Sequence, residues 1–112
     1  MSRENIAIAQ GQLDAYNVQD LDTHVGFYAD NMVIANLNEA PNLEGIEAYR
    51  ERMAGVFSGF PSNKVELLNR MVLGNKVIDH EKVMRSPSAE PFEVVAIYTI
   101  ENDKIARVDF IK

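Results

Sequence analysis

Asp79, His80 and Glu81 are adjacent in the sequence, and all three side chains can transfer protons or bind metal ions. A carboxylate beside an imidazole can act as a general base, and the same groups can ligate zinc. Whether the three can act together depends on the backbone, because successive residues of a β-strand point to opposite faces of the sheet. The secondary structure around the triplet therefore decides its chemistry.

A β-hairpin is predicted around the triplet. The dipeptide Gly74-Asn75 is typical of a two-residue turn between strands at 64–73 and 76–85. The register that follows from this turn places Arg70 opposite Asp79, where the two charges would form a cross-strand ion pair. Strand alternation then sends His80 to one face and both acids to the other. We therefore expect neither a zinc site nor a proton relay built from all three residues.

The two faces of the predicted hairpin differ in charge. The face with Asp79 and Glu81 carries four charged residues, while the face with His80 carries only Lys82. We therefore expect the His80 face to point inward. Its residues are Val65, Leu67, Asn69, Met71, Ile78, His80, Lys82 and Met84. An inward His80 is either a core histidine that hydrogen-bonds Asn69 or a polar group in a ligand cavity.

The spacing of apolar residues in the rest of the chain predicts the other helices and strands. Apolar residues recur at helical spacing after Ser2, a suitable N-cap, and Asp20 can cap a short second helix. A strand is predicted at 32–37, a loop at 38–43 and a third helix that ends before Pro61. The predicted order is α-α-β-α-β-β-β-β, a single α+β domain over residues 1–112, with a mostly antiparallel sheet and helices on one face.

A second hairpin is expected to pair residues 92–101 with 104–111 through a type I turn and a bulge, with Asp103 in the left-handed conformation. Its uncharged face is expected inside and consists of Val94, Ala96, Tyr98, Ala106, Val108 and Phe110. The opposite face, which includes Val95, Ile97 and Ile111, is too apolar to be fully hydrated. A sheet that is apolar on both faces but has helices for only one predicts a homodimer.

The composition excludes several classes of function. The net charge of −6 does not provide the basic surface that nucleic acids require, and the chain has no cysteine for disulfides or zinc. The first residues lack the apolar core of a signal peptide, and no segment approaches membrane-spanning length. We expect a cytoplasmic protein that uses neither a metal nor another cofactor.

Two segments, Gln19–Asp22 and Phe27–Ile34, resemble the second helix and first strand of the nuclear transport factor 2-like superfamily. The position of Gly45 before the third helix and the closing segment YTIENDKIARVDFI also resemble that superfamily. The resemblance is to SnoaL-like and ketosteroid isomerase-related members. It implies a cone-shaped α+β fold in which a curved sheet and the helices enclose a deep pocket.

The resemblance also implies where ketosteroid isomerase residues would fall. The position of the catalytic base is Asn36, whose amide cannot accept a proton at useful pH, and the position of the aspartic acid is Ala96. The position of the tyrosine lies near Gln12, with Tyr16 one helical turn away. Ketosteroid isomerisation itself is therefore not expected.

The sequence predicts a small SnoaL-like domain whose largely apolar pocket binds a small hydrophobic organic molecule. If it is an enzyme, isomerase or lyase chemistry with His80 as the acid–base residue is expected. The alternatives are a non-catalytic ligand-binding domain and a dimerisation module. The expected pocket-lining residues are Gln12, Tyr16, Asn36, Met53, Asn69, Met84, Ala96, Tyr98 and Phe110.

Overall fold

The computed structural model describes the backbone of residues 2–112 and the side chains from residue 4 onward. The predicted N-cap side chain of Ser2 lies outside the described residues. The helices are α1 (Ser2–Asn17), α2 (Leu21–Val25) and α3 (Ile46–Gly59). The prediction that Asp20 caps α2 is confirmed, because the backbone N–H of Thr23 donates to Asp20 Oδ1 at 3.2 Å.

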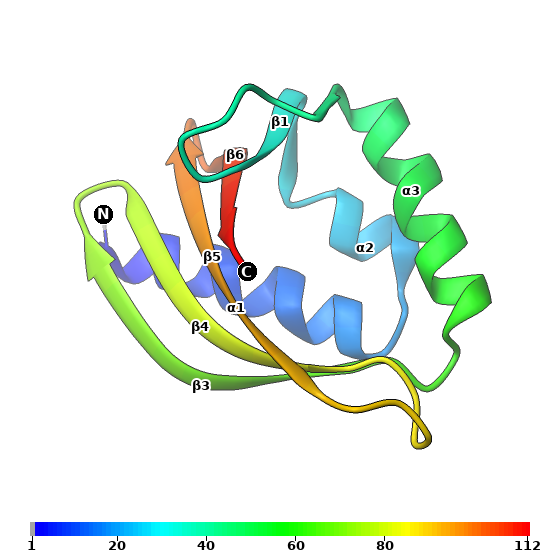
Figure 1. Cartoon of the computed structure of the whole chain (residues 1–112). Helices are drawn as coiled ribbons and strands as arrows, with labels where there is room; N and C mark the ends of the chain where they lie inside the picture. The colour runs from blue at the N-terminus through cyan, green and yellow to red at the C-terminus, as the bar shows by residue number, and fades with distance from the viewer. Residues whose placement is uncertain (1) are drawn as a thin grey trace.

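Six strands form one curved, unclosed sheet, and the helices lie on its concave side (Figure 1). The strands are β1 (Tyr28–Asn36), β2 (Leu43–Glu44), β3 (Lys64–Leu73), β4 (Lys76–Met84), β5 (Phe92–Glu101) and β6 (Lys104–Ile111). Their spatial order is β2-β1-β6-β5-β4-β3. Only the β1–β6 pair is parallel, so the predicted α+β architecture with a mostly antiparallel sheet is confirmed. The short strand β2 was missed, because it begins at the end of the segment predicted as a loop.

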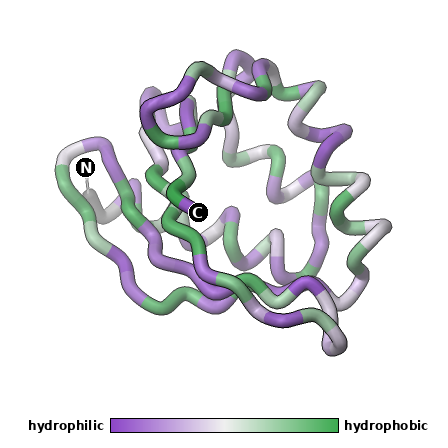
Figure 2. The backbone as a smooth tube through the Cα atoms, in the orientation of Figure 1, coloured by the Kyte–Doolittle hydropathy of each residue, from purple (hydrophilic) through white to green (hydrophobic). Residues whose placement is uncertain are grey.

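The core lies between the helices and the concave face of the sheet. Met32, Ile105 and Val108 are almost completely buried at its centre, and Leu13 packs with Val83 in a second cluster. Figure 2 shows hydrophilic and hydrophobic residues following one another along the strands, as expected for a sheet with one face packed on a core. No helix within residues 2–112 is long and apolar enough to cross a membrane.

The first hairpin has the predicted turn but the opposite orientation. Asp79 and Glu81 are 0% and 5% exposed, whereas the side chain of His80 is 43% exposed. The prediction that the His80 face points inward was therefore wrong. Arg70 explains the result: its Nε and Nη2 donate to the two carboxylate oxygens of Asp79 at 2.7 and 2.9 Å. The predicted ion pair forms, and by neutralising both charges it allows this face to be buried.

A bulge at Leu68 divides β3 into two halves. Leu67 pairs with Glu81 and Asn69 pairs with His80, so one residue of β3 has no partner on β4. Before the bulge, Val65 is buried as predicted; after it, Asn69 and Met71 are exposed and Arg70 points inward. The uniform alternation assumed for β3 fails at this residue.

The second hairpin closes with a tighter turn than expected. Asn102 and Asp103 both have positive φ, 52° and 62°, and Glu101 pairs directly with Lys104. This is the pattern of a two-residue type I′ turn. The bulge lies instead in β6, where the register shifts between Ile105 and Arg107. As a result Ile105 is completely buried in place of Ala106, which was predicted to face inward.

Candidate functional site

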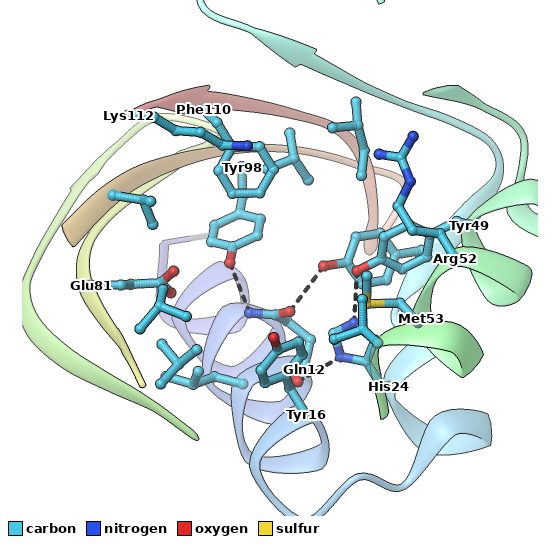
Figure 3. A pocket seen from close by; sticks show the side chains of 18 of the residues that line it. Gln12, Tyr16, His24, Tyr49, Arg52, Met53, Glu81, Tyr98, Phe110 and Lys112 are labelled. Carbon is cyan, nitrogen blue, oxygen red and sulfur yellow. Dashed lines mark hydrogen bonds between the residues drawn. The ribbon is translucent and has the colours of Figure 1, made fainter. Parts of the chain in front are cut away.

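A cavity of about 260 Å³ lies between the helices and the concave face of the sheet (Figure 3). Helices α1, α2 and α3 and strands β1, β3, β4, β5 and β6 all contribute to its wall. The predicted residues Gln12, Tyr16, Met53, Tyr98 and Phe110 line it. Other side chains of the wall are Leu13, His24, Tyr28, Tyr49, Glu81, Val83 and Val94.

The other expected lining residues lie elsewhere. Asn69 is exposed on β3, and Asn36 and Met84 are half-buried at the ends of their strands. Ala96 faces the interior but is completely buried in the core. His80 lies on the opposite face of the sheet, where its Nε2 is 2.6 Å from Oε1 of the exposed Glu93. The structure therefore does not bring His80 to the cavity.

Glu81 is a carboxyl group in the cavity wall that the sequence-based prediction placed on the wrong face. Its side chain is buried, and Oε2 has no hydrogen-bond partner among the described residues. Burial raises the pKa of Glu81 to about 8, and the neighbouring Asp79 acts in the same direction. Arg70 and the Tyr98 hydroxyl act in the opposite direction on this pKa. Near neutral pH, Glu81 can therefore both hold and release a proton, as a general acid–base residue must.

Gln12 organises the polar groups on the floor of the cavity. Its Nε2 donates to the Tyr98 hydroxyl at 3.0 Å and to the Ala9 carbonyl at 3.1 Å. The Tyr28 hydroxyl donates to its Oε1 at 2.9 Å. These bonds set the orientation of the amide, because its two donors and its acceptor all have partners. Since Tyr98 accepts from Gln12, the Tyr98 proton is free to point to Glu81.

His24, the second histidine, is a structural part of the same wall. Burial lowers its pKa to about 4, so the ring is neutral at pH 7. Its Nδ1 lies 2.7 Å from the Gln12 carbonyl, which can only accept, so Nδ1 carries the proton. Its Nε2 then accepts from the Tyr49 hydroxyl at 2.7 Å. With both nitrogens engaged, His24 fixes Tyr49 and does not offer a free base.

The cavity hydroxyls are proton donors. Burial raises the pKa of Tyr28, Tyr49 and Tyr98 above the usual tyrosine value. Tyr16 accepts hydrogen bonds from Asn63 Nδ2 and from Arg85 Nη1, the latter at 3.1 Å. Its own proton has no acceptor among the hydrogen bonds of the described residues. The site thus combines one titratable carboxyl group with neutral hydroxyls that can donate to a ligand oxygen.

No group of three or more histidine, cysteine, aspartate or glutamate side chains within the described part of the chain is arranged to hold a metal ion.

A SnoaL-like domain model matches residues 9–108, which is most of the chain. The chain belongs to the SnoaL-like domain family. This places it in the nuclear transport factor 2-like superfamily that the sequence resembles. Among curated proteins, no relative matches the sequence.

Solved structures support the same assignment. An uncharacterised cystatin-fold protein from Novosphingobium aromaticivorans is 38% identical to this SnoaL-like domain. The match covers 96% of this chain and 97% of that one, with a TM-score of 0.89. A protein assigned as a polyketide cyclase from Sinorhizobium meliloti is 24% identical over 94% of each chain, with a TM-score of 0.79. A protein assigned as a ketosteroid isomerase from Kribbella flavida is 12% identical over 96% of this chain and 76% of that one, with a TM-score of 0.81. The last two similarities establish a shared fold.

Proposed function

We propose that this SnoaL-like domain binds a small, largely apolar organic molecule in its cavity and catalyses a proton transfer of the isomerase or lyase type. Glu81 is the acid–base residue of this proposal and replaces His80 in that role. The observation that carries it is the unpartnered Glu81 Oε2 in the cavity wall. A buried carboxyl oxygen without a partner is costly to folding, and such strain is commonly retained where a ligand group will meet it.

The surrounding residues suit a reaction at a carbon next to a carbonyl group. Ionised Glu81 would take the proton from carbon, and its acid form would return it to another carbon or to a leaving group. The ligand oxygen, which gains negative charge during this step, would accept a hydrogen bond from the Tyr16 hydroxyl. Because Arg85 and Asn63 donate to that hydroxyl, they strengthen it as a donor.

The ring opening of 5-nitrobenzisoxazole tests whether Glu81 is a base. In this reaction a base removes the proton on the ring carbon, the C–H electrons form a nitrile, and the N–O bond breaks to release a coloured phenolate. We expect the rate to rise with pH with a midpoint near the Glu81 pKa of about 8. Replacing Glu81→Gln should lower the rate at pH 9 by about 100-fold or more.

His80→Gln is the matched control, because it removes the exposed titratable residue on the other face of the same strand. It should leave both the rate and the midpoint unchanged. A Glu81→Gln protein that opens the ring as fast as the unmodified protein would refute the catalytic proposal. If the rate does not depend on Glu81 but the reagent shifts the NMR signals of the cavity tyrosines, the protein would be a non-catalytic ligand-binding domain.

We also propose that the protein is a homodimer formed through the outer face of the sheet. Met71, Ile78 and Ile97 form a cross-strand row on that face, since Met71 pairs with Ile78 and Ile78 pairs with Ile97. Met71 is 58% exposed, and the helices of the described residues lie on the other, concave side of the sheet (Figure 1). Sedimentation should give a dimer for the unmodified protein and a monomer for Ile97→Lys. A monomer in both cases would refute this proposal.

A further inference from the structure

The arginines of the described residues fall into two groups. Three of them form an ion pair with an aspartate: Arg50 with Asp22 at 2.7 Å, Arg70 with Asp79 at 2.7 Å and Arg107 with Asp109 at 3.0 Å. The other two arginines with described side chains, Arg52 and Arg85, take part in none of the ion pairs found there. Both of these line the cavity. Among the arginines with described side chains, those without a counter-ion are therefore the two that line the cavity.

Arg85 is held in place by groups that carry no negative charge. Its guanidinium carbon lies 5.6 Å from the centre of the Phe60 ring and 5.7 Å from that of Phe92. Both are cation–π distances, and Nη1 also donates to the Tyr16 hydroxyl. The planar guanidinium has five N–H groups, so most of its donors have no partner among the described hydrogen bonds. A half-buried cation that is oriented in this way is ready to bind an anion in two-point contact.

The geometry of β4 connects this cation to Glu81. Glu81, Val83 and Arg85 all line the cavity, as alternate residues on one face of an extended chain should. The Cα atoms of Glu81 and Arg85 are therefore separated by about 13 Å, with the apolar Val83 between them. Since both side chains line the same cavity of about 260 Å³, one or two rings can lie between the carboxyl group and the guanidinium.

The net charge of −6 opposes the approach of an anionic ligand, so local positive charge at the cavity would favour its binding. The cavity wall provides the opposite sign. Besides Arg85 it includes Arg52 and Lys112, two exposed cations whose side chains are drawn in Figure 3. Against these three, Glu81 is the carboxyl group in the cavity wall.

We propose that the ligand of this cavity is an apolar ring compound that carries an anionic group, such as a carboxylate. Arg85 binds the anionic group, and the apolar body extends along Val83 toward Glu81. This inference rests on the proposed use of the cavity and adds the chemical class of its ligand. It also assigns Arg85 as the residue that selects for charge.

A pair of nearly isosteric probes separates charge from shape. 2-Naphthoate and 2-naphthamide share one ring system and differ in the charge of the substituent. Calorimetric titration of the unmodified protein at pH 7 should give a dissociation constant about 10-fold lower for the naphthoate. The preference should decrease as salt is added, because part of it comes from Arg52 and Lys112 at the exposed edge.

Replacing Arg85→Gln should remove most of this preference by weakening the naphthoate and leaving the naphthamide little changed. Arg50→Gln is the matched control, since it removes an arginine that is paired with Asp22 and does not line the cavity. Arg85→Lys keeps the charge without the two-point contact and should retain part of the preference. This variant provides the comparison if Arg85→Gln does not fold.

The results separate this inference from the catalytic one. Equal affinity for the two probes, or no binding of either, would overturn the anionic ligand. If the two probes bind with equal affinity, ring opening of the neutral isoxazole that depends on Glu81 would still support the proposed proton transfer. Conversely, a naphthoate preference that depends on Arg85, together with no ring opening, would retain the ligand class and refute the proton transfer.

Discussion

Asp79 and Glu81 are two carboxyl groups on the same face of one strand, separated by a single residue and both buried. Asp79 has both oxygens bonded to Arg70, which in turn donates from Nη1 to Gln10 Oε1 at 2.9 Å. Glu81 has an oxygen without a partner and a pKa raised to about 8. Both acids are therefore buried, but Asp79 is held in an ion pair while Glu81 has a raised pKa and an oxygen without a partner among the described residues. The difference between them is the presence of a cation within hydrogen-bond distance.

The largest effect is expected for Asp79→Ala. This change leaves the mostly buried Arg70 guanidinium without its counter-ion, so it should lower the free energy of unfolding by about 3–5 kcal/mol. Urea denaturation monitored by circular dichroism measures the loss. Asp109→Ala, which breaks the more exposed pair with Arg107, should cost no more than about 1 kcal/mol. Equal losses in the two variants would contradict the distinction drawn for Asp79.

Glu81→Gln should stabilise the protein at high pH. The folded-state pKa of about 8 lies above the ordinary 4.5, so the folded chain binds more protons than the unfolded chain between these values. The contribution of Glu81 to stability is therefore greatest below pH 4.5 and is lost as the pH rises to about 8. At pH 9 the variant should be more stable than the unmodified protein by about 3–5 kcal/mol, because each unit of the rise in pKa from 4.5 to about 8 is worth roughly 1.4 kcal/mol.

The two proteins should be nearly equal in stability at pH 4.5, because glutamine has the shape of the protonated acid. His24 does not disturb this comparison. Its pKa is lowered from 6.5 to about 4, so its penalty appears as the pH falls below 6.5 and is the same in both proteins. A constant difference between pH 4.5 and 9 would contradict the raised pKa.

Tyr98→Phe should have an intermediate effect on stability, and it tests how the neighbours of Glu81 set the pKa of that residue. The Gln12 amide loses an acceptor but keeps the Ala9 carbonyl, so stability should fall by about 1 kcal/mol. The pKa of Glu81 should rise further, because the Tyr98 hydroxyl favours the ionised carboxylate. The midpoint of the ring-opening profile measures this shift. Tyr49→Phe, which removes the bond to His24, should cost similar stability without moving the midpoint.

His80→Gln should have the smallest effect. The exposed pair with Glu93 is screened by solvent. The free energy of unfolding, measured by urea denaturation, should therefore change by no more than about 0.5 kcal/mol. A loss above about 2 kcal/mol would show that the outer face is a packed surface in solution. In that case, repeating the measurement with Ile97→Lys would test whether the dimer contact is responsible.

The fold was largely readable from sequence because its signals are local. The Gly74-Asn75 turn sets the register of the first hairpin, and this register correctly predicts that Arg70 meets Asp79. The face that points inward is a tertiary property, and counting charges misjudged it. Two of the four charges neutralise each other, and a third, Glu81, is readily protonated when buried.

The site could be predicted only in part, because the residues that cover a strand are set by the tertiary structure. Gln12 and Tyr16 were placed at the pocket by the resemblance to ketosteroid isomerases, and both line the cavity. Glu81 could not be distinguished from a solvent-exposed strand residue without knowing what covers it. Arg85 follows a strand and precedes a loop, and the sequence does not indicate the two aromatic rings that hold it.

The bulge at Leu68 has a consequence for how this scaffold tolerates change. Inward residues of β3 have odd numbers before it and even numbers after it, as Val65 and Arg70 illustrate. One half of the strand thus belongs to the cavity wall and the other to the ion pair, each in its own phase. Removing the single extra residue would put the two halves in phase with each other. The pairs Leu67–Glu81 and Asn69–His80 would then follow each other in one regular ladder, with Val65 and Arg70 both still facing inward. Leu68 is therefore the position at which this strand can lose a residue and still keep both the cavity wall and the Arg70–Asp79 pair.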